Sequence, residues 1–161
     1  METLNTQSIL ATSPWEVELS EVNRRGARVA IWLVLILYPL FGLLDYLIAP
    51  AQSLPYLFSG RAMVIIISLI MLRSLNNVRL MENIEVISAL YMFLVGAGIT
   101  FMICFMGGLS SPYYAGLNLV MLGCGLLFVW PPNICILTHG ATFTLWLLPN
   151  LIFVEVSEPL A

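Results

Sequence analysis

Residues 84–106 read IEVISALYMFLVGAGITFMICFM, and this stretch decides the fold class of the chain. Glu85 is its only charged residue. The hydrocarbon core of a bilayer is spanned by roughly 20 consecutive apolar residues in a helix, because lipid offers no hydrogen-bond partners to exposed backbone groups. The length and composition of this stretch therefore predict a transmembrane helix.

Similar apolar stretches lie on both sides of it. The chain of 161 residues is 60% hydrophobic and only 9% charged, whereas a soluble domain carries roughly 25% charged residues. We therefore predict an all-α, polytopic helical membrane protein with about five transmembrane helices. The expected spans are residues 29–48, 56–75, 84–106, 113–130 and 134–154. The last two are joined by a very short link, which predicts that they are antiparallel neighbours.

The segment before the first span has a different pattern. Ser13, Pro14 and Glu16 are typical of a helix start, with Ser13 as N-cap and Glu16 completing a capping box. Apolar residues then recur at helical spacing opposite acidic residues and Asn23, which predicts an amphipathic helix on the membrane surface. A flexible tail is the alternative. The expected division is a segment of residues 1–24 with a juxtamembrane helix and a transmembrane domain of residues 25–161.

The arginines predict an orientation. All the basic residues are arginine, and they gather before the first span and after the second, within residues 24–28 and 73–79, with Arg61 between. Basic residues near span ends favour the cytoplasm, so we expect a cytoplasmic N-terminus. An odd number of spans then places the C-terminus outside. The second half of the chain has no cation, which argues against nucleic-acid binding.

Asp45 and Arg61 are charged residues within the first and second spans. Such groups are costly in lipid and are usually paired or functional. At about 1.5 Å per helical residue, both lie in the outer part of the membrane on adjacent helices. We hypothesise a structural ion pair that fixes the hairpin of these two spans. Independent snorkelling of both side chains to the outer interface is the alternative.

A polar and aromatic turn, GGLSSPYY at residues 107–114, leads into the fourth span. Tyr113, Tyr114 and Asn118 offer hydrogen bonds beside apolar residues, and Asn150 lies at a similar depth in the fifth span, where it could pair with Asn118. These residues predict a shallow ligand-binding site for a small or lipid-like signal. Anchoring at the membrane interface is the alternative for the two tyrosines.

Gly116 and Gly123 lie on one face of the fourth span, seven residues apart. Small residues let helices approach closely, either within the chain or between two copies. His139 is the only histidine, and we expect a hydrogen-bonded packing role for it, with pH sensing as the alternative. The cysteines have no metal-binding spacing and one histidine cannot supply two haem ligands, so we expect no metal and no cofactor.

Two segments resemble a known group of membrane regions: FGLLDYLIAP at residues 41–50 and GGLSSPYYAGLNLVMLGCGLLFVWPP at residues 107–132. They are similar to the N-terminal multi-span regions of bacterial sensor histidine kinases and class III adenylate/guanylate cyclases. The resemblance implies a homodimer in the bacterial inner membrane, with a sixth span leading to a cytoplasmic catalytic domain. This chain stops at Ala161 before either, so we expect a membrane fragment of a longer protein or a short stand-alone relative.

The leading functional hypothesis is a membrane-embedded signal-input or anchoring module, with membrane lipids and a second copy as partners. The sequence has no nucleotide-binding, phosphoacceptor or catalytic motif, so any kinase or cyclase activity belongs to a longer protein. The alternative is a small transporter or channel subunit, which the charges within spans and the Pro and Gly breaks support. A membrane enzyme is the third reading.

Overall fold

The computed structural model describes residues 14–77, 83–106, 111 and 113–157. These residues form five helices: α1 (Pro14–Ile48), α2 (Leu54–Ser74), α4 (Ile84–Phe105), α5 (Tyr114–Leu127) and α6 (Pro132–Ser157). All except α5 are long and apolar enough to cross a membrane. The described part of the chain is thus all-α, with the character of a helical membrane protein.

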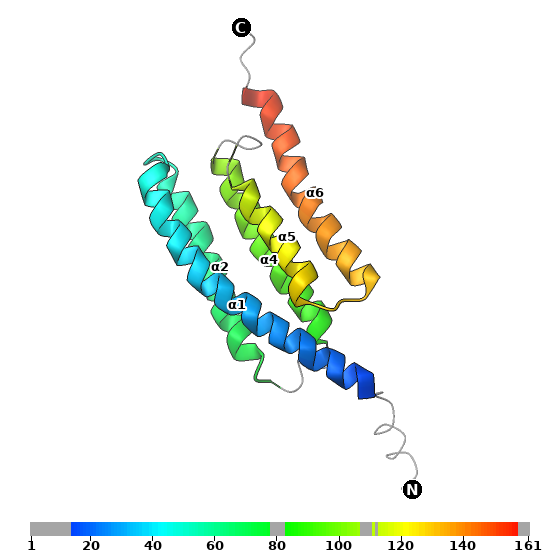
Figure 1. Cartoon of the computed structure of the whole chain (residues 1–161). Coiled ribbons are helices and arrows are strands. Elements are labelled where there is room, and N and C mark those ends of the chain that lie inside the picture. Colours follow the sequence, from blue (N-terminus) through cyan, green and yellow to red (C-terminus); the bar gives the residue numbers. More distant parts are fainter. Residues whose placement is uncertain (1–13, 78–82, 107–110, 112, 158–161) are drawn as a thin grey trace, which may run out of the picture.

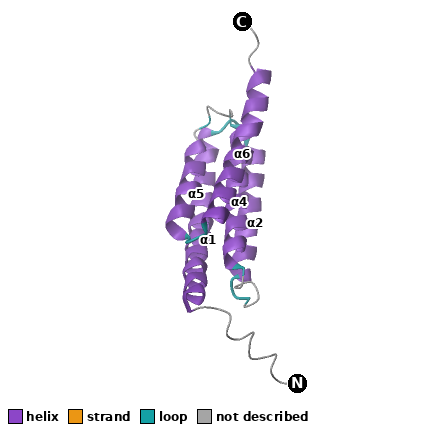
Figure 2. Ribbon diagram, turned by 90° about the vertical axis from the view of Figure 1, so that its right-hand side faces the viewer, coloured by secondary structure: helices purple, strands orange, loops and turns teal. Residues whose placement is uncertain are grey.

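The helices run roughly along one axis, and α4 is the central one (Figure 1). It packs against each of the other four helices. The outer helices expose large apolar side chains, such as Ile48, Leu126 and Ile136, each more than 70% exposed. Such exposure suits lipid contact, because lipid tails are as apolar as leucine. The start of α1 and the end of α6 lie at opposite ends of the bundle (Figure 2).

α1 joins two segments that the sequence separated. Its 35 residues run from Pro14 through Ile48 in one helix, so the expected surface segment and the first span are continuous. At about 1.5 Å per residue the helix is about 52 Å long, against about 30 Å for the hydrocarbon core. Arg25 pairs with Glu21 one turn earlier, at 3.2 Å, which supports the helix where the cations lie. The predicted N-cap, Ser13, is outside the described residues.

The fourth span is shorter than predicted. α5 has 14 residues and ends at Leu127, and Phe128 is extended, with φ −124° and ψ 143°. The helix ends there because Pro131 disfavours helical backbone at Trp130 and cannot donate a hydrogen bond. The predicted span of residues 113–130 was therefore wrong at its end. Of residues 107–112 in the turn before α5, only Ser111 is described, because residues 107–110 and 112 lie outside the described ranges.

α6 packs chiefly on α4, which runs parallel to it, and has little contact with α5. The last two spans run in opposite directions, as predicted, but the main packing partner of α6 is α4 and not α5 (Figure 1). Gly96 explains the preference: a Cβ at Gly96 would lie 2.8 Å from Cγ2 of Thr142, so the backbones of α4 and α6 approach closely. His139 of α6 reaches α5, with Nε2 3.2 Å from the carbonyl oxygen of Met121.

The two glycines of the predicted packing face, Gly116 and Gly123, differ in their surroundings. A Cβ at Gly116 would lie 3.7 Å from Cδ1 of Ile99, so Gly116 packs against α4, whereas Gly123 has open space around its Cα. A tighter contact occurs at Gly98, where an added Cβ would overlap Cγ2 of Val64 on α2. The contacts at Gly96, Gly98 and Gly116 therefore all involve α4, whereas an added Cβ at Gly26 of α1 would overlap the backbone of Leu127 in α5.

We expect the change Gly98→Ala to destabilise the fold by about 1–3 kcal/mol, because the β-branched Val64 cannot move aside without shifting α2. Unfolding by titration with sodium dodecyl sulfate in mixed micelles measures the effect. Gly125→Ala is the control: no atom lies within 4 Å of a Cβ there, so we expect a gain of up to about 1 kcal/mol from helix propensity. Equal effects of the two changes would contradict the close contact.

Candidate functional site

The two charged residues within the first two spans lie in contact. Nε of Arg61 donates to Oδ2 of Asp45 at 2.6 Å, and the residues are only 5% and 3% exposed, respectively. The hydroxyl of Tyr113, the N-cap residue of α5, donates to Oδ1 of Asp45. The structure therefore has the pairing arrangement that we hypothesised, in place of independent snorkelling, and it adds a third helix.

Tyr38 extends this group to α4. Nη1 of Arg61 donates to the carbonyl oxygen of Tyr38 at 3.3 Å, and the hydroxyl of Tyr38 donates to the carbonyl oxygen of Val95 at 3.2 Å. The guanidinium carbon lies 5.7 Å from the Tyr38 ring centroid and 5.9 Å from that of Tyr113, within cation–π range. We call Tyr38, Asp45, Arg61 and Tyr113 the Asp45 cluster.

The Asp45 cluster combines the two sites that the sequence suggested, but not all their residues. Tyr113 joins it, whereas Tyr114 and Asn118 are exposed. Asn150 is buried on α6, and its Nδ2 donates to the carbonyl oxygen of Trp146 at 2.5 Å. Among the described residues no hydrogen bond joins Asn118 to Asn150, so the suggested amide pair was wrong. The reason is packing: α6 lies chiefly against α4, and Asn118 is on an exposed face of α5.

We therefore expect Asn118→Leu and Asn150→Leu to act independently. Asn118→Leu should change stability by less than about 0.5 kcal/mol, and Asn150→Leu should cost about 1–3 kcal/mol by removing a buried hydrogen bond. The double variant should equal the sum within about 0.5 kcal/mol. Unfolding titrations of the three variants measure this. A larger deviation from additivity would indicate contact between the two amides.

A second polar group lies at the other end of the bundle. Asn23 of α1 is fully buried, and its side-chain amide forms two hydrogen bonds with Val129. Nδ2 donates to the carbonyl oxygen of Val129 at 3.0 Å, and Oδ1 accepts from its N–H at 2.8 Å. We call this pair the Asn23 clamp. It satisfies both backbone groups of a residue that lies outside the helices, as non-helical backbone inside a membrane requires.

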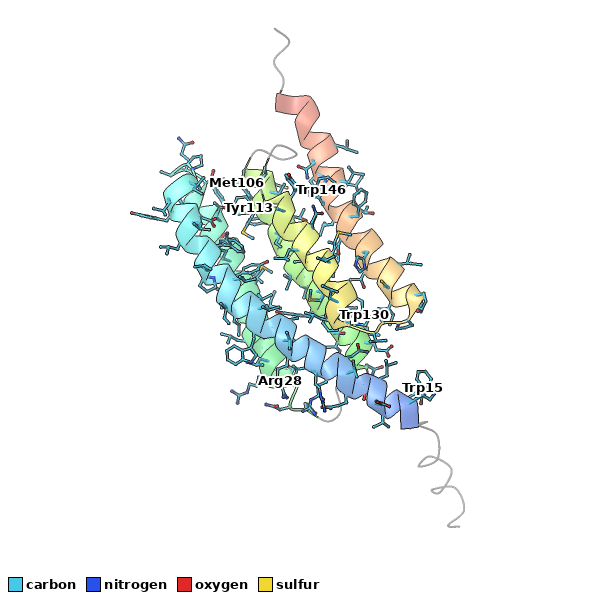
Figure 3. All side chains as sticks on the ribbon, in the orientation of Figure 1. Trp15, Arg28, Met106, Tyr113, Trp130 and Trp146 are labelled. Carbon is cyan, nitrogen blue, oxygen red and sulfur yellow. The ribbon has the colours of Figure 1, made fainter. Side chains whose placement is uncertain are left out.

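The neighbours of the Asn23 clamp tie the same end to α2 and α4. Nη2 of Arg24 donates to the carbonyl oxygen of Leu75, the C-cap residue of α2, at 3.0 Å, where a cation also suits the helix dipole. Nε1 of Trp130 donates to Oγ of Ser88 on α4 at 3.0 Å. Figure 3 shows Trp130 and Arg28 at this end, and Tyr113 at the end that carries the Asp45 cluster.

The sequence did not suggest Tyr38, Asn23 or Trp130 as parts of a site. Asn23 was placed on the polar face of a surface helix, and its partner is 106 positions away in sequence. The available signal was Pro131, which predicts extended backbone before it and hence unpaired N–H and C=O groups. Within the described ranges, no group of three or more His, Cys, Asp or Glu side chains is placed to hold a metal ion.

Comparison of the chain with protein-family models, curated proteins and solved structures found no match.

Proposed function

We propose that this chain is a membrane-embedded signal-input or anchoring module of a bacterial signal-transduction protein. One observation carries the proposal: a single continuous helix, α1, holds both polar groups. Asp45 and Asn23 are 22 residues apart on α1, which is about 33 Å along the helix axis. A shift of α1 at the Asp45 cluster would therefore reach the Asn23 clamp on the other side of the membrane.

The mechanism that we propose needs two packings of α1 and no catalytic residue. In one packing the Asp45 cluster and the Asn23 clamp are both closed, as described above. A signal that binds one packing better shifts the population by its differential affinity, and a few kcal/mol is enough. A continuous helix, here with Pro39 between the two polar groups, can transmit displacements of about 1–2 Å, which is typical of such transitions.

The finer features of the proposal come from the sequence. They are a multi-pass protein of the inner membrane with five spans and a cytoplasmic N-terminus, acting as a homodimer. The output is a histidine kinase or a nucleotide cyclase domain, as the resemblance implies. A dimer suits both outputs, and Gly123 of α5, where an added Cβ would meet no other atom of the chain, offers a close approach for a second copy.

Spin labels test whether α1 transmits a change. Labels at Val17 and Leu137, both more than half exposed, report the distance between α1 and α6 at the end that carries the Asn23 clamp. Tyr113→Phe removes one hydrogen bond from the Asp45 cluster without adding a charge, and we expect it to change the labelled distance by about 1–2 Å.

The control is Tyr114→Phe, which removes an exposed hydroxyl one residue later. It should leave the labelled distance unchanged. An unchanged distance in Tyr113→Phe as well would contradict transmission through α1. Solute flux through liposomes that contain only this chain would instead favour the transporter alternative.

A further inference from the structure

A groove of about 460 Å³ lies between α1 and α2, beside the Asp45 cluster. Its walls are almost entirely apolar, and Arg61 is the one charged side chain that lines it. Leu43 and Tyr46 on its rim are 63% and 68% exposed, so the groove opens toward lipid. Its volume lies within the range of about 300–1,000 Å³ that is usual for small-molecule sites.

Gly42 keeps the groove open where it meets Arg61. A Cβ at Gly42 would lie 3.3 Å from Cδ of Arg61 and 3.7 Å from Cε1 of Phe58, so any larger side chain would enter the groove. The absence of a side chain at Gly42 leaves Cδ and Nε of Arg61 beside the groove, which Arg61 lines. The two hydrogen bonds described for Arg61, to Asp45 and to the carbonyl oxygen of Tyr38, use only part of its donor fork.

The depth of Arg61 restricts what it can meet. α2 has 21 residues and begins at Leu54, so its length of about 31 Å matches the hydrocarbon core. Arg61 lies about 10 Å below the first residue of α2. Phospholipid headgroups stay at the edge of the hydrocarbon core, and their acyl chains carry no oxygen at this depth. A hydrogen bond to Arg61 from the groove therefore needs a different amphiphile.

The net charge of the site determines whether the polar group of a bound amphiphile can be charged. Asp45 already neutralises Arg61 at 2.6 Å, so a bound carboxylate, sulfate or phosphate would leave a net negative charge inside the membrane. Such a charge is costly. An uncharged oxygen accepts a hydrogen bond without that cost.

We infer that the groove binds an uncharged single-chain amphiphile. Its alkyl chain lies between α1 and α2, and a hydroxyl or ester carbonyl oxygen accepts a hydrogen bond from Arg61. The bound molecule touches Tyr38, which joins the Asp45 cluster to Val95 of α4, and Arg61, which joins α2 to Asp45 of α1. Binding is independent of the proposed function, and only its role as a signal rests on that function.

Photolabelling tests the ligand class. The full chain is placed in phosphatidylcholine nanodiscs with hexadecanol that carries a diazirine in mid-chain. We expect saturable labelling on the groove walls, at Leu43, Tyr46 and Phe58. Unlabelled hexadecanol should compete at least about tenfold better than hexadecyl sulfate. Equal competition by the two, or unsaturable labelling spread over all lipid-exposed faces, would overturn the inference.

A blocking variant tests the place. Ala62 lines the groove and is exposed, so Ala62→Trp fills the groove without burying the indole in the core. We expect groove labelling to fall about tenfold. Met63 is 63% exposed and does not line the groove, so Met63→Trp, at the same depth, should change labelling by less than about twofold. Unchanged labelling in Ala62→Trp would place the bound molecule elsewhere.

The distance between labels at Val17 and Leu137 separates this inference from the proposed function. If hexadecanol labels the groove but leaves that distance unchanged, the binding site stands and the signalling role fails. If Tyr113→Phe changes the distance while groove labelling is unsaturable, the proposed function stands and the binding site fails.

Discussion

Asp45→Leu is expected to destabilise the chain by about 3–5 kcal/mol, because it leaves the guanidinium of Arg61 buried without its counter-ion. Arg61 is only 5% exposed, so water cannot replace the lost carboxylate in the native packing. The same change also leaves the hydroxyl of Tyr113 without its acceptor. Unfolding by sodium dodecyl sulfate titration, followed by tryptophan fluorescence, measures the loss.

The double variant Asp45→Leu with Arg61→Leu is expected to lose much less than the sum of the two single variants. Buried ion pairs can often be replaced by apolar residues at little net cost, whereas a lone buried charge cannot. The double-mutant cycle should therefore give an interaction energy of about 2–3 kcal/mol. Additive losses would show that the pair does not stabilise the fold through direct contact.

Arg73→Leu is the matched control, because it removes an arginine from the same helix at an exposed position. Arg73 lies in the last turn of α2, where its charge suits the helix dipole. We expect this change to cost less than about 1 kcal/mol. A loss as large as that of Arg61→Leu would mean that charge on α2, and not pairing with Asp45, sets the stability.

The positions of the apolar spans were the feature that the sequence predicted best. The second and third, predicted at residues 56–75 and 84–106, correspond to Leu54–Ser74 and Ile84–Phe105. Their limits were readable because polar residues or proline flank each apolar run. Asp45 and Arg61 were also readable as candidates, because a charge inside an apolar run is visible without any knowledge of packing.

The sequence did not predict where the backbone leaves the helix inside a stretch that is apolar throughout. Phe128, Val129 and Trp130 are as apolar as the helix before them, so composition does not separate extended backbone from helix at this point. The continuity of α1 was missed for the opposite reason. Arg24, Arg25 and Arg28 mark an interface by composition, but the hydrogen bonds of a helix are local and continue through polar residues.

The sequence also did not predict which residues far apart in the chain contact each other. The bonds from Asn23 to Val129 and from Tyr113 to Asp45 join residues that are 106 and 68 positions apart. Periodicity gives the face of a helix on which a residue lies, but not the helix that packs there. The pattern of acidic residues beside Asn23 made its face look solvated, because most of that face does carry charge.

Asn23→Leu is the second change for which we expect a large effect. It leaves the N–H and the carbonyl group of Val129 without the partners that the amide supplies at 2.8 and 3.0 Å. A buried backbone group without a partner costs about 1–3 kcal/mol, so two should cost about 2–6 kcal/mol. Leucine is close to asparagine in size, so the loss comes from the missing hydrogen bonds and not from a large cavity. Unfolding titrations measure the loss, and hydrogen exchange of the Val129 amide should become faster.

Two further variants identify the source of that loss. Asn23→Asp keeps an oxygen that accepts from the Val129 N–H but removes the donor to the Val129 carbonyl oxygen, so it should remain destabilising. Ser20→Ala removes an exposed hydroxyl that bonds only within α1, and it should change stability by less than about 0.5 kcal/mol. If Asn23→Leu were as mild as Ser20→Ala, with unchanged exchange at Val129, the extended backbone before Pro131 would be held by Trp130 and the proline pair alone. The Asn23 clamp would then not be the connection through which α1 reaches the segment between α5 and α6.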